Sequence, residues 1–527
     1  MRKIPSTMAT QHPDNAMGSP FSGNRYISNA EEIDECYRCF SELGVGEYMW
    51  DWEGKFVDEA VIDRLYQNYH EYFTKNQLGR DKFLTFRIPN IWEETSHRLP
   101  RAFMNLISAE HAAKKYGFHS PPLFEVILPM TTRSDQLIYL QKKFREIADA
   151  TEEIFDMKSD MKHIQVIPLF EEVETMADAF RILEEYIQFL QDEYHYKPEY
   201  MRVFIARSDP AMNAGLIPAI IALKNAVSAY HEFGRKHGIK IFPWVGGGSL
   251  PFRGAINPEN ALFAVQEYGG VASLTIQSAF RSDYPLKDVK DAIKLFNTQL
   301  PKNLTNYRQI SPEESKILKE FNQKSQKYFQ EIVEEIAPLI NTVAGKLPSH
   351  RERVQHIGIF GYARGIGKVK LPRAIKFTGS LYSLGVPPEL IGTGRALKLA
   401  KDMGIEKLIR ELYINLQRDL SHAGHYLNRE NLQKLSEKDS IWKTVEGGID
   451  LIEDFIGESI GPTSPHHFIH RNFASNVLQK MEVEEDIAED VLRAAEIRKS
   501  LGGIPLAKNS FCLIMLAHFS LSPCVES

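Results

Sequence analysis

Carboxylates that follow two apolar runs of the chain could hold a hard metal cation. Glu171 and Glu172 end the run PLFEE, and Asp209 ends the run IARSD. Carboxylates from neighbouring strand ends, with positions left open for water and substrate oxygens, suit Mg²⁺ or Mn²⁺. Asp209 and Glu172 also precede helical patterns, so they could instead be helix N-caps. The pattern leaves both interpretations open.

Five arginines next to apolar stretches could bind a small polyanion. They are Arg87, Arg253, Arg281, Arg364 and Arg373. Guanidinium groups neutralise phosphate and carboxylate without competing as acids. Arg373 follows a proline and precedes an apolar stretch, so it could also extend into solvent from a helix start. If the five converge on one place, they favour an anionic substrate.

The segment Trp244–Gly254 (WVGGGSLPFRG) could form an anion cradle. Glycines such as Gly247 and Gly248 let backbone N–H groups approach an anion closely, and Arg253 would add charge. The segment is not a Walker A loop, which needs GxxxxGK[ST]. A flexible surface turn is the alternative.

His12 lies in STMATQHPDN (Ser6–Asn15), a segment with neither a strand period nor a helical period. Pro13 favours an extended backbone at His12. An ordinary loop is one interpretation. The other is a tethered acid–base arm folded into a site, because a His beside an Asp and hydroxyl groups can move protons near neutral pH.

Eight short apolar runs that alternate with helical patterns would position these side chains. The runs are Glu47–Trp52, Phe83–Arg87, Leu123–Pro129, Ile164–Leu169, Arg202–Ala206, Ile239–Val245, Ala272–Ile276 and His356–Gly361. Eight parallel βα units predict an α/β fold, a (β/α)8 TIM-type barrel. The carboxyl ends of the strands then share one face, and charged or glycine-rich residues follow nearly every run.

Additional helices are expected to be inserted into this barrel and appended to it. A helical stretch at about 295–350 is predicted to precede the eighth strand, and a helical C-terminal part covers about 372–503. Val483, Ile487, Val491 and Ala495 have the spacing of one helical stripe. We expect one catalytic domain over 1–503 and a C-terminal extension over 504–527.

The composition is typical of a soluble globular chain. Of the 527 residues 43% are hydrophobic and 25% are charged, and the net charge of −6 gives no electrostatic footprint for nucleic acid. Four cysteines fit a reducing cytosol; Cys36 and Cys39 form a CxxC that is either half of a zinc site or one turn of a helix. With no signal segment and no apolar run long enough for a membrane span, we expect a cytoplasmic protein.

Taken together, the motifs resemble the archaeal-type, short form of phosphoenolpyruvate carboxylase. The matching segments, in order from residue 1 to about 503, are TQHPDN, WDWEGK, IPLFEEV, ARSDPAMNAGL, GGGSLPFRG, TIQSAFR, FGYAR, LPRAIKFTG, LYSLGVPPELIGTGRAL and a DLxxAGxYLN element. The resemblance implies an anaplerotic carboxy-lyase that converts phosphoenolpyruvate and bicarbonate into oxaloacetate and phosphate. It implies a path through carboxyphosphate and the enolate of pyruvate, Mg²⁺ or Mn²⁺ as cofactor, and a homotetramer.

The resemblance also implies roles for individual residues. His12 would be the base of the carboxylation stage, with Arg253 and Arg373 as the catalytic arginines near the phosphoryl group. Glu171 and Asp209 would be the metal ligands. The substrate-binding residues would be Arg87, Arg207, Gly247, Gly248, Gln277, Arg281 and Arg364.

Some positions depart from the long bacterial form of the family. Met212 stands where the long form has a Lys thought to help hold bicarbonate, so Arg207 is our candidate for that contact. Val245 and Gly247 replace a His and an Arg. Two other functions stay open: a metal-dependent aldolase or lyase acting on a 2-oxo acid, and an inactive paralogue that binds phosphoenolpyruvate as a sensor.

Overall fold

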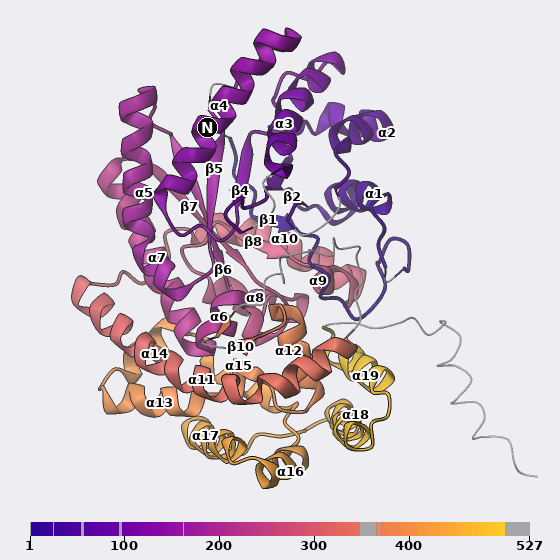
Figure 1. Ribbon diagram of the computed structural model, residues 1–527, viewed down its shortest axis with the longest axis vertical. Helices are drawn as coiled ribbons and strands as arrows, with labels where there is room; N and C mark the ends of the chain where they lie inside the picture. Colours follow the sequence, from indigo (N-terminus) through magenta and orange to yellow (C-terminus); the bar gives the residue numbers. More distant parts are fainter. Residues whose placement is uncertain are drawn as a thin grey trace, which may run out of the picture.

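The centre of the molecule is a closed barrel of eight parallel strands in sequential order (Figure 1). The computed structural model describes residues 2–24, 26–53, 57–93, 97–161, 163–347, 365–366 and 369–500. The barrel strands are β1 (Thr7–Ala9), β2 (Glu47–Asp51), β3 (Phe83–Arg87), β4 (Glu125–Leu128), β5 (Gln165–Phe170), β6 (Tyr200–Ala206), β7 (Lys240–Gly246) and β8 (Ser273–Ile276). The predicted α/β barrel is confirmed.

The first barrel strand is one that the sequence did not reveal. β1 lies within the segment predicted to be a loop or an arm, and it pairs with β2 on one side and β8 on the other. Three residues are too few to show an alternation, so no period could identify this strand. The seven predicted runs between 47 and 276 correspond to β2 to β8, and the predicted strand His356–Gly361 lies outside the described residues.

Helices that follow the strands surround the barrel, and the shortest of them lie in the loops at the carboxyl ends of the strands. They are α1 (Glu31–Arg38) with the π-helical turn η1 (Cys39–Leu43), α2 (Val61–Lys75), α3 (Arg98–Lys115), α4 (Ser134–Phe155), α5 (Val173–Tyr194), α6 (Ser208–Ala214), α7 (Leu216–His237), the 3-10 turns η2 (Pro251–Arg253) and η3 (Pro258–Asn260), α8 (Ala261–Glu267), α9 (Ser278–Ser282) and α10 (Leu286–Asn303). Because helices cover the outer face of the barrel and side chains fill its interior, the strands read as continuous apolar runs.

Side chains fill the barrel interior. An apolar layer includes Phe204 and Trp244, whose rings stack with their centroids 3.9 Å apart. Nearby, the fully buried Arg202 pairs with Glu47 at 2.6 Å and with Glu125 at 2.7 Å. Since the interior is packed, chemistry must take place at the strand ends and their loops.

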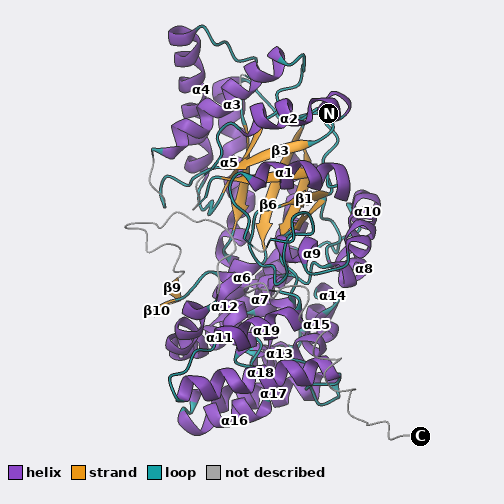
Figure 2. Ribbon diagram, turned by 90° about the vertical axis from the view of Figure 1, so that its right-hand side faces the viewer, coloured by secondary structure: helices purple, strands orange, loops and turns teal. Residues whose placement is uncertain are grey.

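A second group of helices lies beyond the carboxyl ends of the strands, in the lower half of Figure 2. It comprises α11 (Pro312–Lys346), the small strands β9 (Gly365–Ile366) and β10 (Val369–Lys370), α12 (Ala374–Ser383), the 3-10 turn η4 (Pro388–Leu390), α13 (Thr393–Asp402), α14 (Glu406–Leu412), α15 (Leu416–Gly424), α16 (Arg429–Lys438), α17 (Ile441–Ile456), α18 (Pro465–Glu482) and α19 (Ala488–Arg498). These helices share a hydrophobic core with α6 and α7, which joins them to the barrel.

The long helix α11 follows the closed barrel instead of interrupting it. The sequence placed these helical residues before an eighth strand, but β8 already closes the barrel against β1. The start of α11 is set by a capping box, in which Ser311 and Glu314 accept each other's backbone N–H groups, with Pro312 at the first helical position. The domain over 1–503 stays a prediction, and the extension over 504–527 lies outside the described residues.

Two smaller sequence interpretations are also resolved. Val483 follows α18 and is exposed, whereas Val491 and Ala495 are buried in α19, so the predicted single helical stripe is wrong. Cys36 and Cys39 are buried in α1 and at the start of η1, as a helical turn requires. Burial, and then the neighbouring Cys39, raises the pKa of Cys36 well above its ordinary value, which keeps it a thiol.

Neither a metal cluster nor a membrane helix occurs in the part of the chain that the structure describes. No three His, Cys, Asp or Glu side chains there form a group that could hold a metal ion. No helix there has both the length and the apolar character that crossing a bilayer requires.

Candidate active site

The segment that follows β1 brings His12 and Asp14 to the carboxyl-end face of the barrel. Nδ1 of His12 lies 2.9 Å from Oγ1 of Thr10. The carbonyl oxygen of His12 accepts the backbone N–H of Asp14 at 3.0 Å and that of Ser278 at 3.4 Å. His12 is partly exposed and Asp14 is fully buried. The structure therefore holds the histidine at the face where barrel enzymes place catalytic groups.

Arg253, in η2, donates a hydrogen bond from each of its three guanidinium nitrogens. Nη1 donates to Oδ2 of Asp14 at 2.9 Å, Nη2 donates to Oε1 of Gln277 at 2.6 Å, and Nε donates to Oγ of Ser208 at 3.3 Å. The side chain is about 3% exposed. A guanidinium group has five N–H bonds, so two of those of Arg253 are not used by these contacts. Residues from three strand ends thus fix one cation.

The glycines of the β7 loop make room for Arg253. A Cβ atom on Gly248 would lie 2.7 Å from Cζ of Arg253, and one on Gly247 would lie 2.7 Å from the carbonyl oxygen of Arg253. The N–H of Gly248 donates to that same carbonyl oxygen, and the N–H of Gly247 donates to Oγ1 of Thr275. Both N–H groups therefore donate to acceptors within the protein. Glycine fits at these positions because the loop backbone lies too close to Arg253 for a Cβ atom.

Arg87 and Arg373 share a carboxylate at the ends of β2 and β3. Nε and Nη2 of Arg87 donate to the two oxygens of Asp51 at 2.9 and 2.7 Å. Glu53 lies 2.8 Å from Nη1 of Arg87 and also 2.8 Å from Nη2 of Arg373. Burial opposes the charge of Arg87, but Asp51 and Glu53 outweigh it and hold the pKa of Arg87 well above its ordinary value. Glu53 thereby links the barrel to the start of α12.

The β1 segment connects these two groups of side chains. Oε1 of Gln11 accepts the backbone N–H of Asp51 at 3.0 Å, while Asp14 holds Arg253 three residues further on. The segment that carries His12 therefore contacts both groups, the one that contains Arg87 and Arg373 and the one that contains Arg253.

Arg281, predicted to bind substrate, makes structural contacts. Its Nη1 donates to the carbonyl oxygens of Thr10 and Ile276 at 3.0 and 2.5 Å, and its Nη2 donates to Oε1 of Glu35 at 3.0 Å. The side chain is 1% exposed. These contacts tie the ends of β1 and β8 together.

Arg207 points toward the interface between the barrel and the C-terminal helices. Its Nη1 donates to the carbonyl oxygen of Phe252 at 3.4 Å, and its side chain lines a narrow cavity with Glu267 and Asp419. Met212 is fully buried in α6, within the core that joins the barrel to the helices. Arg364, the last of the predicted arginines, lies outside the described residues.

Glu171 and Asp209 lie at the ends of neighbouring strands. β5 pairs with β6, Glu171 follows β5 directly, and Asp209 lies in the first turn of α6. Glu171 is close enough to Arg87 to raise the pKa of that guanidinium. The donor set is two carboxylates without nitrogen or sulfur, which fits Mg²⁺ or Mn²⁺, since these ions bind through one or two carboxylates and keep several waters.

The partners of the arginines were missed when the sequence was interpreted. Asp14, Asp51, Glu53 and Glu35 hold the guanidinium groups of Arg253, Arg87, Arg373 and Arg281. A signal was present for some of them, because Asp51 and Glu53 lie at the end of β2 and Asp14 lies two residues after His12. Pairing across the barrel, however, has no sequence signature.

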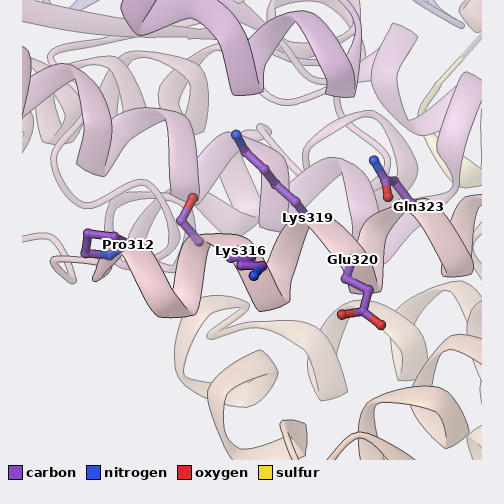
Figure 3. A pocket seen from close by; sticks show the side chains of 6 residues that line it. Pro312, Lys316, Lys319, Glu320 and Gln323 are labelled. Carbon is purple, nitrogen blue, oxygen red and sulfur yellow. The ribbon is translucent and has the colours of Figure 1, made fainter.

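A hollow on the outer surface of α11 does not belong to this site. It has a volume of about 510 Å³ and is lined by residues of that one helix, among them Lys316, Lys319 and Glu320 (Figure 3). Figure 3 shows Lys319 and Glu320 extending in different directions. One helix face with diverging charges presents no converging chemical groups.

The fold and the site together define a class, the (β/α)8-barrel proteins with arginines and carboxylates gathered at the carboxyl ends of the strands. A family model described as phosphoenolpyruvate carboxylase matches residues 4–502. The chain is 41% identical over 506 residues to the phosphoenolpyruvate carboxylase of Leuconostoc mesenteroides subsp. mesenteroides, covering 95% of this chain and 99% of that protein. It is 39% identical over 528 residues to that of Metallosphaera sedula, covering 95% and 100%. The chain belongs to the phosphoenolpyruvate carboxylase family, which confirms the resemblance found in its motifs.

Proposed function

We propose that this chain carboxylates phosphoenolpyruvate with bicarbonate, forming oxaloacetate and phosphate. The observation that supports this most is the β1 segment, which places His12 on the same face as Arg253, Arg87 and Arg373. A trianionic substrate needs several fixed cations, and the second stage of the reaction needs one proton acceptor. Both requirements are met where the β1 segment touches the two arginine groups.

The proposed chemistry has two stages. An oxygen of bicarbonate attacks the phosphorus atom, the phosphorus–oxygen bond to the enol breaks, and carboxyphosphate and the enolate of pyruvate form. His12 then takes the carboxyl proton of carboxyphosphate as it splits into CO₂ and phosphate. The enolate carbon attacks CO₂ to give oxaloacetate, and the proton passes to phosphate.

The arginines would act on charge in both stages. Arg253 would use its remaining N–H bonds on the phosphoryl group, while Arg87 and Arg373 would bind the substrate phosphate and carboxylate. Arg253 and Arg87 are buried, which strengthens such contacts because water competes little there, whereas Arg373 is exposed. Arg207, our candidate for the bicarbonate contact, faces the barrel–helix interface, and this role stays a prediction.

A divalent cation, Mg²⁺ or Mn²⁺, would be held by Glu171 and Asp209 and would supply positive charge for the enolate oxygen and the phosphoryl group. We also propose a homotetramer in the cytoplasm. Sedimentation of the purified protein tests the tetramer. Cys36 and Cys39 form no disulfide, which agrees with a reducing compartment.

The reaction is tested by coupling oxaloacetate to malate dehydrogenase and measuring phosphate in parallel. We expect both products in equal amounts, with strict dependence on bicarbonate and on a divalent cation. Phosphate release without bicarbonate would favour another lyase or aldolase. Binding of phosphoenolpyruvate without any product would favour a sensor.

Replacement of His12 separates the two stages. In His12→Asn we expect oxaloacetate formation to fall at least about 100-fold, since general bases contribute about 10²–10⁴-fold. Bicarbonate-dependent cleavage of phosphoenolpyruvate to pyruvate and phosphate should persist in part. Full retention of oxaloacetate formation would contradict the role of His12.

A further inference from the structure

Glu389 is a buried carboxyl group in a stretch of sequence to which the proposed reaction assigns no role. It lies in η4, within LYSLGVPPELIGTGRAL, and is fully buried. The two prolines Pro387 and Pro388 precede it and restrict the backbone there. A buried carboxyl group at a rigid turn is costly unless it serves as a hydrogen-bond acceptor.

One oxygen of Glu389 accepts two hydrogen bonds from different parts of the molecule. The backbone N–H of Phe252 donates to Oε1 at 2.8 Å, and the hydroxyl group of Tyr382 donates to the same oxygen at 2.8 Å. Oε2 has no hydrogen-bond partner among the described residues. The acceptor function is therefore concentrated on one atom.

One donor belongs to the element that carries Arg253, and the other belongs to the helix that begins after Arg373. Phe252 directly precedes Arg253 in η2, and Tyr382 lies on α12, which begins directly after Arg373. The ring of Phe252 also packs against that of Phe377 on α12, with the centroids 5.8 Å apart. Glu389 thus joins the turn of Arg253 to the helix that follows Arg373.

The surroundings of Glu389 fit an acceptor better than a counter-charge. Burial raises its pKa to about 7, and its hydrogen bonds and the more distant Arg207 oppose that rise only in part. A group with such a pKa is not held ionised by a close cation. The turn therefore requires an oxygen atom at this position that accepts hydrogen bonds.

We propose that Glu389 is a positioning residue for catalysis, which fixes the turn carrying Arg253 against α12 through a single carboxyl oxygen. A shift of about 1 Å in a group that acts on the reacting atoms can cost about 100-fold in rate. The proposal rests on the proposed function, because it assigns Glu389 to the phosphoryl-transfer stage through Arg253.

Two conservative substitutions separate the effect of side-chain length at position 389 from the effect of charge. Glu389→Gln keeps the length and an acceptor oxygen but removes the charge, and we expect kcat within about threefold of the unsubstituted protein. Glu389→Asp keeps the charge but is one methylene shorter and cannot reach both donors, so we expect kcat to fall at least tenfold with a smaller change in KM for phosphoenolpyruvate. The opposite pattern, with Asp active and Gln inactive, would overturn the proposal in favour of an electrostatic role.

A double-mutant cycle tests whether the effect passes through Arg253. We expect Glu389→Asp to cost less than about twofold when it is added to Arg253→Lys, because the positioned group is already altered. An equal loss in both backgrounds would show a general structural role and overturn the proposal. Thermal unfolding of each variant serves as the folding control. If the Asp variant does not fold, a folded but inactive Gln variant would still overturn the proposal.

The unsubstituted protein distinguishes a failure of this inference from a failure of the function. If it forms no oxaloacetate, the proposed function is wrong. If it forms oxaloacetate and Glu389→Asp keeps full kcat, the function stands and the positioning role of Glu389 is wrong.

Discussion

At the scale of single residues, each of the four described arginines predicted near the mouth of the barrel is paired with a carboxylate. Asp14 pairs with Arg253, Asp51 and Glu53 with Arg87, Glu53 with Arg373, and Glu35 with Arg281. For Arg253, Arg87 and Arg281, which are buried, such pairing offsets the cost of burying a guanidinium group, whereas Arg373 is exposed. It also orients the N–H bonds that remain for a substrate.

Asp14 offers the clearest test of this pairing. In Asp14→Asn the carboxamide can still accept the backbone N–H of Ala279, as Oδ1 of Asp14 does at 2.8 Å, but the ion pair to Arg253 is lost. We expect kcat/KM for phosphoenolpyruvate to fall at least tenfold, because a buried arginine is left uncompensated. Steady-state kinetics measures the loss.

Asp283 provides the matched control for Asp14. Its two oxygens accept the backbone N–H groups of Ala16 and Met17, each at 2.6 Å, so it holds the same segment without touching Arg253. Asp283→Asn should lower the unfolding temperature with a much smaller loss of kcat/KM. Equal losses in both variants would mean that the segment as a whole, and not the Arg253 pair, is responsible.

At the scale of elements, the short strand β1 depends on its neighbours. It has three residues, and Arg281 of α9 ties its end to the end of β8 through two carbonyl oxygens. An isolated three-residue strand has no stability of its own, since strands are stabilised by pairing and packing. α9 and β8 therefore decide whether the His12 arm is ordered.

Replacing Arg281 by Lys should loosen this arm. Lysine lacks the planar fork that reaches two carbonyl oxygens and Glu35 at once. We expect the free energy of unfolding to fall by roughly 2–3 kcal/mol and amide exchange over residues 7–11 to accelerate. Arg133→Lys is the control, since its pair with Asp135 is exposed and should contribute little. Unchanged exchange in the Arg281 variant would contradict this assignment.

At the scale of the whole molecule, buried charged groups join the barrel to the C-terminal helices. Arg207 and Glu267 come from the barrel, and Asp419 comes from α15, where its carboxylate accepts the hydroxyl group of Tyr413 at 2.7 Å. Burial first, and then Glu267, raises the pKa of Asp419 to about 7, although the hydrogen bond from Tyr413 and the charge of Arg207 oppose the shift. The interface therefore holds a carboxyl group that titrates near neutral pH.

This titration predicts how stability depends on pH. Because the pKa of Asp419 is about 7 in the folded state and 3.8 ordinarily, its protonated form favours folding, and that contribution is lost as the pH rises from about 4 to 7. Asp419→Asn stays neutral. We expect the unfolding temperature of the variant, relative to that of the unsubstituted protein, to rise between pH 5 and pH 8.

A surface variant gives the baseline for this pH series. Asp402→Asn changes an exposed carboxylate paired with Lys398, and its relative unfolding temperature should stay nearly flat over the same range. A flat profile for Asp419→Asn as well would show that Asp419 is ionised throughout.

The sequence by itself determined the barrel, seven of its strands and the family. Those strands are long enough to show their apolar character, and motifs such as TQHPDN and GGGSLPFRG lie close together in the chain. Such patterns can be recognised in the sequence because they depend on residues that are neighbours in the chain.

Only the tertiary structure decided which residues meet. β1 is recognised through pairing with strands about 40 and 270 residues away, and the partners of Arg253 and Arg373 are 239 and 320 residues away. It also showed that Gly247 and Gly248 make space for Arg253, and that Arg207 faces the helices. Contacts at such separations depend on how the barrel closes and how the helices pack, and neither leaves a period or a motif in the sequence.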